Sequence, residues 1–269
     1  MTIIKLRESS SMAIDSKTLR EAQLIMLEML VEFDSICKKH NLQYWLDSGT
    51  LLGAVRHQGF IPWDDDIDLS MPVEDYNRFK EIAQSELSER IFFQTKETDS
   101  TFKFDYMKLR SNKAKIVEFH EKGKKIAYHQ GVFVDIFPML TLPNSEFHEK
   151  FYDGIFQFIR SVSAESLHTP EGTDQPEIRE KLLEALSLMH QGFEGDNLKV
   201  IYGGEMPDVA AWFDKDKVFP LKTLSFEGRE FPVPNDAHHY LDNIYSFNFM
   251  ELPPLDKRTI HADSIEINR

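Results

Sequence analysis

The chain has 269 residues and a net charge of −14, with 41% hydrophobic and 28% charged residues. This balance is ordinary for a folded globular protein, and the negative charge argues against general affinity for nucleic acids or anionic membranes. The single cysteine, Cys37, excludes an internal disulfide and cysteine-rich zinc sites, and it fits a reducing cytoplasm. Since no apolar run approaches the roughly 20 residues that span a bilayer, we expect no transmembrane segment and no signal peptide.

Taken in chain order, the pattern predicts an α+β protein with a small mixed β-sheet flanked by helices. Residues 1–14 are expected to form a flexible arm, and a helix with one apolar stripe is predicted from about 16 to 40. A strand at 43–47, a helix at 50–57 and a strand at 67–71 follow. The remaining predictions are a helix at 75–87, strands at 91–95, 104–110, 114–120 and 132–137, helices at 145–165 and 177–190, loops at 192–208, a β-element at 224–233 and a helix at 236–246.

The most informative run is Ile-Pro-Trp-Asp-Asp-Asp-Ile-Asp-Leu, from Ile61 to Leu69. On a strand, Asp66 and Asp68 share one face, while Ile67 points to the other. Two carboxylates side by side repel each other, and a divalent cation such as Mg²⁺ or Mn²⁺ removes the conflict. A solvated acidic surface is the simpler alternative. An EF-hand loop is excluded because Leu69 stands where that loop requires glycine.

Two further features lie on either side of this run. Gly49 and Thr50 stand at the start of a predicted helix that ends near Arg56. Free backbone N–H groups, a hydroxyl group and the helix dipole favour a phosphate at such a position, although a glycine there is commonly only a turn. Asp135 is the lone acid of an apolar strand at 131–138, where a carboxylate is costly unless it is paired or bound to a metal. A strand-end cap is the alternative for Asp135.

Together these pieces resemble the active site of the nucleotidyltransferase fold, and the longer motifs resemble the signature of the LicD family. Fukutin and fukutin-related protein are similar, more distant members of that family. The matching runs are Thr50–His57, Gly59–Asp68, Asp75–Tyr76, Lys108–Arg110, Val134–Pro138, Phe226–Gly228, Val233–Pro234 and Leu252–Pro254, with Arg258 and His261 continuing the series. The resemblance therefore extends from about residue 19 to 261. Tyr245-Ser246 departs from the Tyr-Gly that the family often has.

The resemblance implies an enzyme that transfers phosphocholine from CDP-choline to a glycan hydroxyl of teichoic acid or lipopolysaccharide type and releases CMP. Fukutin-like relatives use CDP-ribitol instead. The implied cofactor is Mg²⁺ or Mn²⁺, expected as two ions, held by Asp66, Asp68 and Asp135. The Gly49 backbone and Thr50 would hold donor phosphates. Positive charge would come from basic residues, and we expect Arg56, Lys108 and Arg110 in that role.

Three assignments complete the expected site. Asp135 is the first candidate for the base that accepts the proton of the acceptor hydroxyl, and Asp64 is the second; Asp65 is expected to face solvent. Choline favours an aromatic enclosure, since a quaternary ammonium is attracted to ring faces. Trp63 is assigned to the donor site, and Trp45, Phe60, Tyr76 and Tyr106 also lie near the acidic run, with core packing as the alternative for most of these rings.

The expected organisation is a nucleotidyltransferase-like catalytic core at 15–140 and a mainly helical, acceptor-side part at 141–269 packed on it. A lipid-linked glycan acceptor would place this cytoplasmic protein at the inner face of the membrane. Two other classes stay open on the sequence alone. One is a true nucleotidyltransferase that consumes ATP or CTP, because the metal motif is common to both. The other is a non-catalytic glycan- or partner-binding protein on the same scaffold.

Overall fold

The computed structural model describes residues 14–162, 175–189, 193, 195, 197–206, 211–245 and 248–268. The predicted N-terminal arm lies outside these residues, apart from Ile14, and so does the end of the helix predicted at 145–165. The described elements, in chain order, are α1 (Ser16–His40), β1 (Trp45–Leu46), α2 (Ser48–His57), β2 (Asp68–Pro72), α3 (Val73–Glu86), β3 (Ile91–Gln94), β4 (Met107–Glu118), η1 (Phe119–Glu121), β5 (Gly131–Pro143), α4 (Glu146–Ser161), α5 (Pro176–Met189), β6 (Leu198–Tyr202), β7 (Trp212–Asp214), α6 (Lys215–Val218), β8 (Lys222–Phe226), β9 (Arg229–Val233), α7 (Ala237–Ile244), η2 (Leu255–Lys257) and β10 (Ala262–Ile267).

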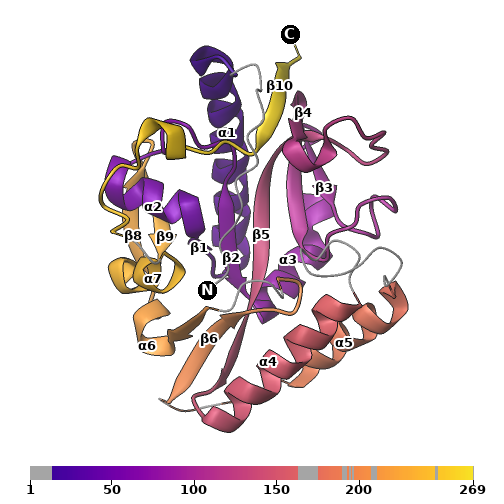
Figure 1. Ribbon diagram of the computed structural model, residues 1–269, viewed down its shortest axis with the longest axis vertical. Helices are drawn as coiled ribbons and strands as arrows, with labels where there is room; N and C mark the ends of the chain where they lie inside the picture. Colours follow the sequence, from indigo (N-terminus) through magenta and orange to yellow (C-terminus); the bar gives the residue numbers. More distant parts are fainter. Residues whose placement is uncertain are drawn as a thin grey trace.

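A mixed sheet forms the centre of the molecule and confirms the predicted α+β class (Figure 1). Its main path runs β1-β2-β5-β4-β10; β3 also pairs with β4, and β6 joins β5 to β7. The pair β2–β5 is parallel, whereas the other pairs are antiparallel. Strands β8 and β9 form a separate hairpin. The long strand β5 therefore pairs both with strands from the N-terminal half of the chain, β2 and β4, and with β6 from the C-terminal half.

The helix α1 forms as the sequence predicts and packs along the sheet. The carboxylate of Asp15 accepts hydrogen bonds from the backbone N–H groups of Lys17 and Thr18, which caps the first turn. Asn41 ends the helix in the left-handed conformation. The apolar stripe that includes Met26 and Leu30 is buried and contacts β4, β5 and β10. Burial of this stripe holds α1 against one face of the sheet.

Several strands differ from the prediction. The strands predicted at 104–110 and 114–120 are one continuous strand, β4, whose pairing with β5 is interrupted by a register shift between Arg110 and Lys115. The loop prediction at 192–208 is wrong for 198–202, because Leu-Lys-Val-Ile-Tyr pairs with the end of β5 as β6. Strand β10 was not expected, and it pairs with β4. In each case a distant partner strand decides the structure, as is common for β-elements.

The helices α4 and α5 lie side by side below the sheet (Figure 1). A second, smaller apolar cluster holds them there, formed mainly by side chains of α4, α5, β5 and β6. Among the described residues, none of the helices is both long enough and apolar enough to cross a bilayer.

Candidate active site

The acidic site is built on the parallel pair β2–β5. Asp68, the first residue of β2, lies opposite Asp135 in the register of the two strands, so both carboxylates rise from the same face of the sheet. Leu69 and Ile136 alternate with them and are fully buried. Strand β2 starts at Asp68, one residue after the predicted start at 67. Asp66 therefore lies just before the strand and not in it. The acids from two separate motifs are thus brought together.

The carboxylates of this site repel one another. Burial raises the pKa of Asp68 well above its usual range, and the neighbouring Asp66 and Asp135 raise it further. Burial also raises the pKa of Asp64, with added contributions from Asp66 and Asp65. The Oδ2 atom of Asp64 is buried, and no hydrogen-bond donor of the described residues reaches it. Such a group of crowded, hard oxygen atoms with an unsatisfied member fits a divalent cation such as Mg²⁺ or Mn²⁺.

Lys108 lies inside the protein beside Asp135. Its Nζ atom is 2.8 Å and 2.9 Å from the two carboxylate oxygens of Asp135, and the side chains are 2% and 9% exposed. The ammonium also lies 3.6 Å from the ring centre of Phe133 and about equally far, 5.6 Å and 5.5 Å, from those of Phe104 and Tyr106. Burial raises the pKa of Asp135 to about 6, and Lys108 opposes that rise. The structure therefore gives Lys108 a carboxylate partner, and its predicted contact with donor phosphates stays a prediction.

Arg110 shares the strand face of Lys108 but is held by other groups. Its Nε donates to Gln94 Oε1 at 2.7 Å, and one Nη donates to the carbonyl oxygen of Gly131 at 2.8 Å. The residue is buried, and its guanidinium lies 4.7 Å from the ring centre of Phe133. These contacts fasten β4 to its neighbours on both sides, and the predicted contact of Arg110 with donor phosphates stays a prediction.

The predicted phosphate-binding turn lies directly beside the acids. Helix α2 begins at Ser48, two residues before the predicted start, and Gly49 and Thr50 are in its first turn. Thr50 Oγ1 accepts a hydrogen bond of 2.9 Å from the backbone N–H of Asp68, which ties the helix start to β2. A Cβ atom on Gly49 would lie 3.1 Å from Asp64 Oδ2, so a larger residue would press on that carboxylate. The turn and the acids therefore form one unit.

Beneath this unit lies Asp47, which our sequence reasoning missed. It is fully buried and caps α2 by accepting from the backbone N–H of Ser48 at 2.6 Å. Its other oxygen accepts from the hydroxyl groups of Tyr202, at 2.8 Å, and Ser70. Burial raises its pKa, while the hydrogen bonds oppose that rise. An aspartate directly before Ser-Gly-Thr is a recognisable helix-cap signal, and it could have identified this residue.

Arg56 and Trp63 contact the segment that follows α7. Arg56 donates to the carbonyl oxygens of Phe249 and Glu251. The guanidinium of Arg258 lies 4.3 Å from the ring centre of Trp63, within the range of a cation–π contact. Both predicted site residues therefore hold neighbouring parts of the chain, and whether they also contact a donor stays a prediction.

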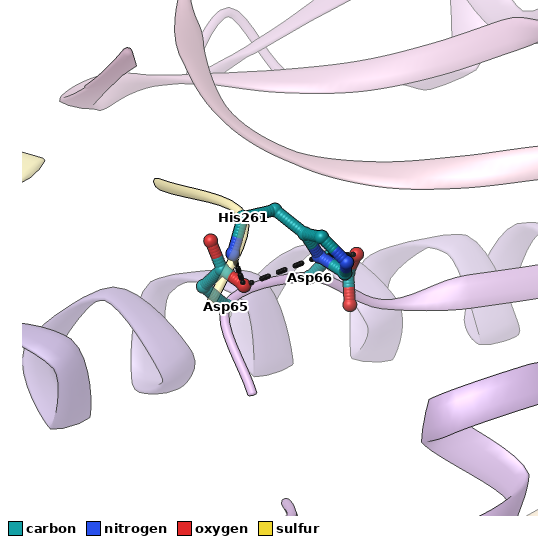
Figure 2. Close-up of side chains that lie close together, drawn as sticks. All are labelled: Asp65, Asp66 and His261. Carbon is teal, nitrogen blue, oxygen red and sulfur yellow. Dashed lines mark hydrogen bonds and ion pairs between the residues drawn. The ribbon is translucent and has the colours of Figure 1, made fainter. Parts of the chain in front are cut away.

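Asp65 contradicts its sequence prediction. It was expected to face solvent, but it is 1% exposed. Its two oxygens accept hydrogen bonds from the backbone N–H groups of His261, at 3.0 Å, and Ala262, at 2.6 Å. The imidazole of His261 lies over Asp65 and Asp66, as Figure 2 shows. The start of β10 needs acceptors for these amides, and Asp65 supplies them.

Tyr245 is a second residue that interacts electrostatically with the acids without having been predicted to. It follows α7 directly and is half-buried. Burial raises the pKa of its phenol, and the negative charges of Asp68 and Asp64 raise it further. The phenol of Tyr245 therefore lies within electrostatic range of the acidic site.

The comparison with known proteins agrees with this geometry. The family model of the LicD/FKTN/FKRP nucleotidyltransferase domain matches residues 41–162, which include the helix start and all the acids of β2 and β5. Lipopolysaccharide cholinephosphotransferase LicD of Haemophilus influenzae is 31% identical over 264 residues, covering 91% of this chain and 96% of that protein. The chain belongs to the LicD family. It is therefore an enzyme of the phosphotransferase type that this family represents.

Other proteins match over shorter stretches. Ribitol 5-phosphate transferase FKRP of Homo sapiens is 40% identical over 65 residues, which are 23% of this chain and 13% of that protein. An uncharacterised protein of Rickettsia typhi is 46% identical over 59 residues, 22% of this chain and 19% of that protein. The human match confirms the predicted likeness to fukutin-related protein.

Proposed function

We propose that this LicD-family protein transfers phosphocholine from CDP-choline to a hydroxyl group of a cell-surface glycan and releases CMP. The observation that carries the proposal is the register of Asp68 with Asp135, which gathers the acids beside the helix start at Gly49 and Thr50. The named activity of the Haemophilus influenzae relative supports phosphocholine as the transferred group and lipopolysaccharide as the type of acceptor. Teichoic acid is the second type of acceptor glycan that we consider.

A divalent cation, Mg²⁺ or Mn²⁺, is part of the proposal. Asp66, Asp68 and Asp135 would hold it, and we propose that they share two ions. The unsatisfied Oδ2 of Asp64 and the raised pKa of Asp68 support this, because both indicate negative charge that the described residues do not balance. When bound, the cation would neutralise charge on the donor pyrophosphate and on the leaving CMP.

The protein's own groups would then act by position and charge. The backbone N–H groups of Gly49 and Thr50, in the first turn of α2, and the Thr50 hydroxyl would bind phosphate oxygens of the donor. The acceptor oxygen forms a bond to the phosphorus of phosphocholine, the bond from that phosphorus to the CMP oxygen breaks, and the acceptor proton goes to a base. Asp135 is the first candidate for that base because its pKa of about 6 lies near neutrality, and Asp64 is the second.

The choice of choline as the donor alcohol rests on the relative and not on an aromatic cage. Trp45, Phe60 and Tyr76 are buried in the core, as the packing alternative predicts. The ring of Tyr106 faces Lys108, and that of Trp63 is covered by Arg258. Ribitol phosphate from CDP-ribitol is the second candidate, favoured by the match to the human ribitol 5-phosphate transferase.

We place the reaction on the cytoplasmic side, where nucleotide-activated donors are made, with a lipid-linked glycan at the inner face of the membrane as the acceptor. The test is CMP release from CDP-choline in the presence of a lipopolysaccharide-type glycan, with Mn²⁺ and with a chelator. We expect release that needs both glycan and metal, and that is lost in Asp68→Asn. Pyrophosphate release from CTP or ATP without use of CDP-choline would instead identify a nucleotidyltransferase, and binding of glycan without turnover would identify a non-catalytic protein.

A further inference from the structure

The segment 248–262 crosses from α7, beside α2, to the start of β10 (Figure 1), and we call it the C-terminal strap. It is fastened at both ends of its path. Arg56 binds the carbonyl oxygens near its beginning, and Arg258 lies on Trp63 while its Nε donates to the carbonyl oxygen of Pro253 at 3.2 Å. At the far end, Asp65 accepts from the two amides described above. The strap is therefore fixed to the acidic run itself.

This last attachment determines where His261 lies. Its backbone N–H is bound by Asp65 Oδ1, and the next residue begins β10, which pairs with β4. The residue thus has little freedom at its backbone, although its side chain is 60% exposed. The buried carboxylate of Asp65 and a strand pair hold an otherwise exposed imidazole at the edge of the acidic site.

The imidazole is oriented towards the acids (Figure 2). Its Nδ1 atom lies 3.2 Å from Asp66 Oδ2 and 3.4 Å from Asp65 Oδ1. Both neighbouring carboxylate oxygens are acceptors, so Nδ1 must carry a proton and donate. This holds for the neutral ring protonated at Nδ1 and for the imidazolium. Hydrogen bonds to Asp65 and Asp66 raise the pKa of His261 well above its usual range. Nδ1 therefore engages one oxygen of Asp66 and leaves the other carboxylate oxygen available.

We propose that His261 is a positioning residue for Asp66: its Nδ1–H fixes one carboxylate oxygen, so that the other is directed to the cation. The proposal rests on the proposed metal-dependent function. Hydrogen bonds from neighbouring groups to metal-binding side chains commonly affect metal affinity by about 10- to 100-fold. Asp65 acts in this arrangement as the clip that holds the strap, since each of its oxygens accepts a backbone N–H.

The chain allows a test that needs no turnover. Mn²⁺ binding to the purified protein is measured by calorimetry for the wild type and for His261→Ala, His261→Asn and His261→Gln. The amide nitrogen of asparagine can take the place of Nδ1, whereas that of glutamine takes the place of Nε2. We expect His261→Ala and His261→Gln to weaken Mn²⁺ binding about 10-fold or more, and His261→Asn to retain most of the affinity. His239→Ala, on α7, is the matched histidine control and should leave binding unchanged.

A second pair of variants tests the role of the clip. Asp65→Asn should also weaken Mn²⁺ binding, and Asp65→Asn/His261→Ala should be no weaker than the worse single variant, since both act through one contact. Thermal unfolding followed by circular dichroism verifies that each variant is folded. Equal Mn²⁺ affinity in all variants, or tighter binding in His261→Ala, would overturn the positioning role while leaving the proposed function intact. A wild-type protein that binds no Mn²⁺ would overturn the metal site and this role together.

Discussion

Replacing Lys108 by methionine should destabilise the fold strongly, because it removes one partner of a buried ion pair. Both oxygens of Asp135 lie within 2.9 Å of the ammonium, and the two side chains are almost completely buried. Methionine retains the length of the side chain, so the loss of charge dominates over any loss of volume. Breaking a buried pair and leaving the other charge in place costs about 3–5 kcal/mol. We therefore expect Lys108→Met to lower the free energy of unfolding by about that amount.

Urea unfolding followed by tryptophan fluorescence and circular dichroism measures the effect. The matched control is Lys113→Met on the same strand, whose ion pair with Glu28 is exposed and should contribute at most about 1 kcal/mol. The double variant Lys108→Met/Asp135→Leu removes both charges and should recover most of the loss. The reasoning is refuted if the free energy of unfolding of Lys108→Met lies within about 1 kcal/mol of the wild-type value, because that is the small effect expected of an exposed pair.

Three further predictions concern the site, the strap and pH. Asp66→Asn and Asp68→Asn should each reduce CMP release by about 100-fold or more, since each removes a proposed cation ligand. The protein should stay folded and at least as stable, because each change also removes a repelling charge; full activity in either variant would refute the shared metal site. Arg56→Ala should release the start of the strap, seen as faster limited proteolysis after α7 and a higher KM for CDP-choline; unchanged kinetics with faster proteolysis would make Arg56 purely structural. Burial raises the pKa of Glu205 from 4.5 to about 7, so its contribution to stability is complete below pH 4.5 and is lost as pH rises to about 7. Glu205→Gln should accordingly unfold at a higher temperature than the wild type at pH 8 but not at pH 4.5, and parallel curves of Tm against pH for the two proteins would contradict the assignment.

The parts of the fold that follow from local pattern were predictable. The cap at Asp15 and the apolar stripe define α1, and the alternation around Ile67 defines β2 almost to the residue. The strands β6 and β10 were not predictable in the same way, because each is short and is stabilised by a partner strand far away in the chain. Local pattern identifies elements here, but pairing determines which weak strands form.

The same distinction applies to the site. The resemblance to the nucleotidyltransferase fold implied that Asp68 and Asp135 belong together, and the strand register brings them opposite each other. It could not predict that Lys108 is paired within the protein, since that depends on the register of β4 with β5. Asp65 was misassigned because its hydrogen-bond donors come from residues 196 and 197 positions later in the chain. A carboxylate in an acidic run looks solvated until the segment that covers it is known.

Calorimetric titration of CDP-choline into the protein, with and without Mn²⁺, tests the central claim most directly. CDP-ribitol, CDP-glycerol, CMP and CTP serve as competing ligands, and Asp68→Asn serves as the site control. A metal-dependent donor site predicts binding that requires Mn²⁺, prefers CDP-choline and is lost in Asp68→Asn. Preference for CTP, or binding of CDP-choline that is equally tight without metal and in Asp68→Asn, would contradict the account.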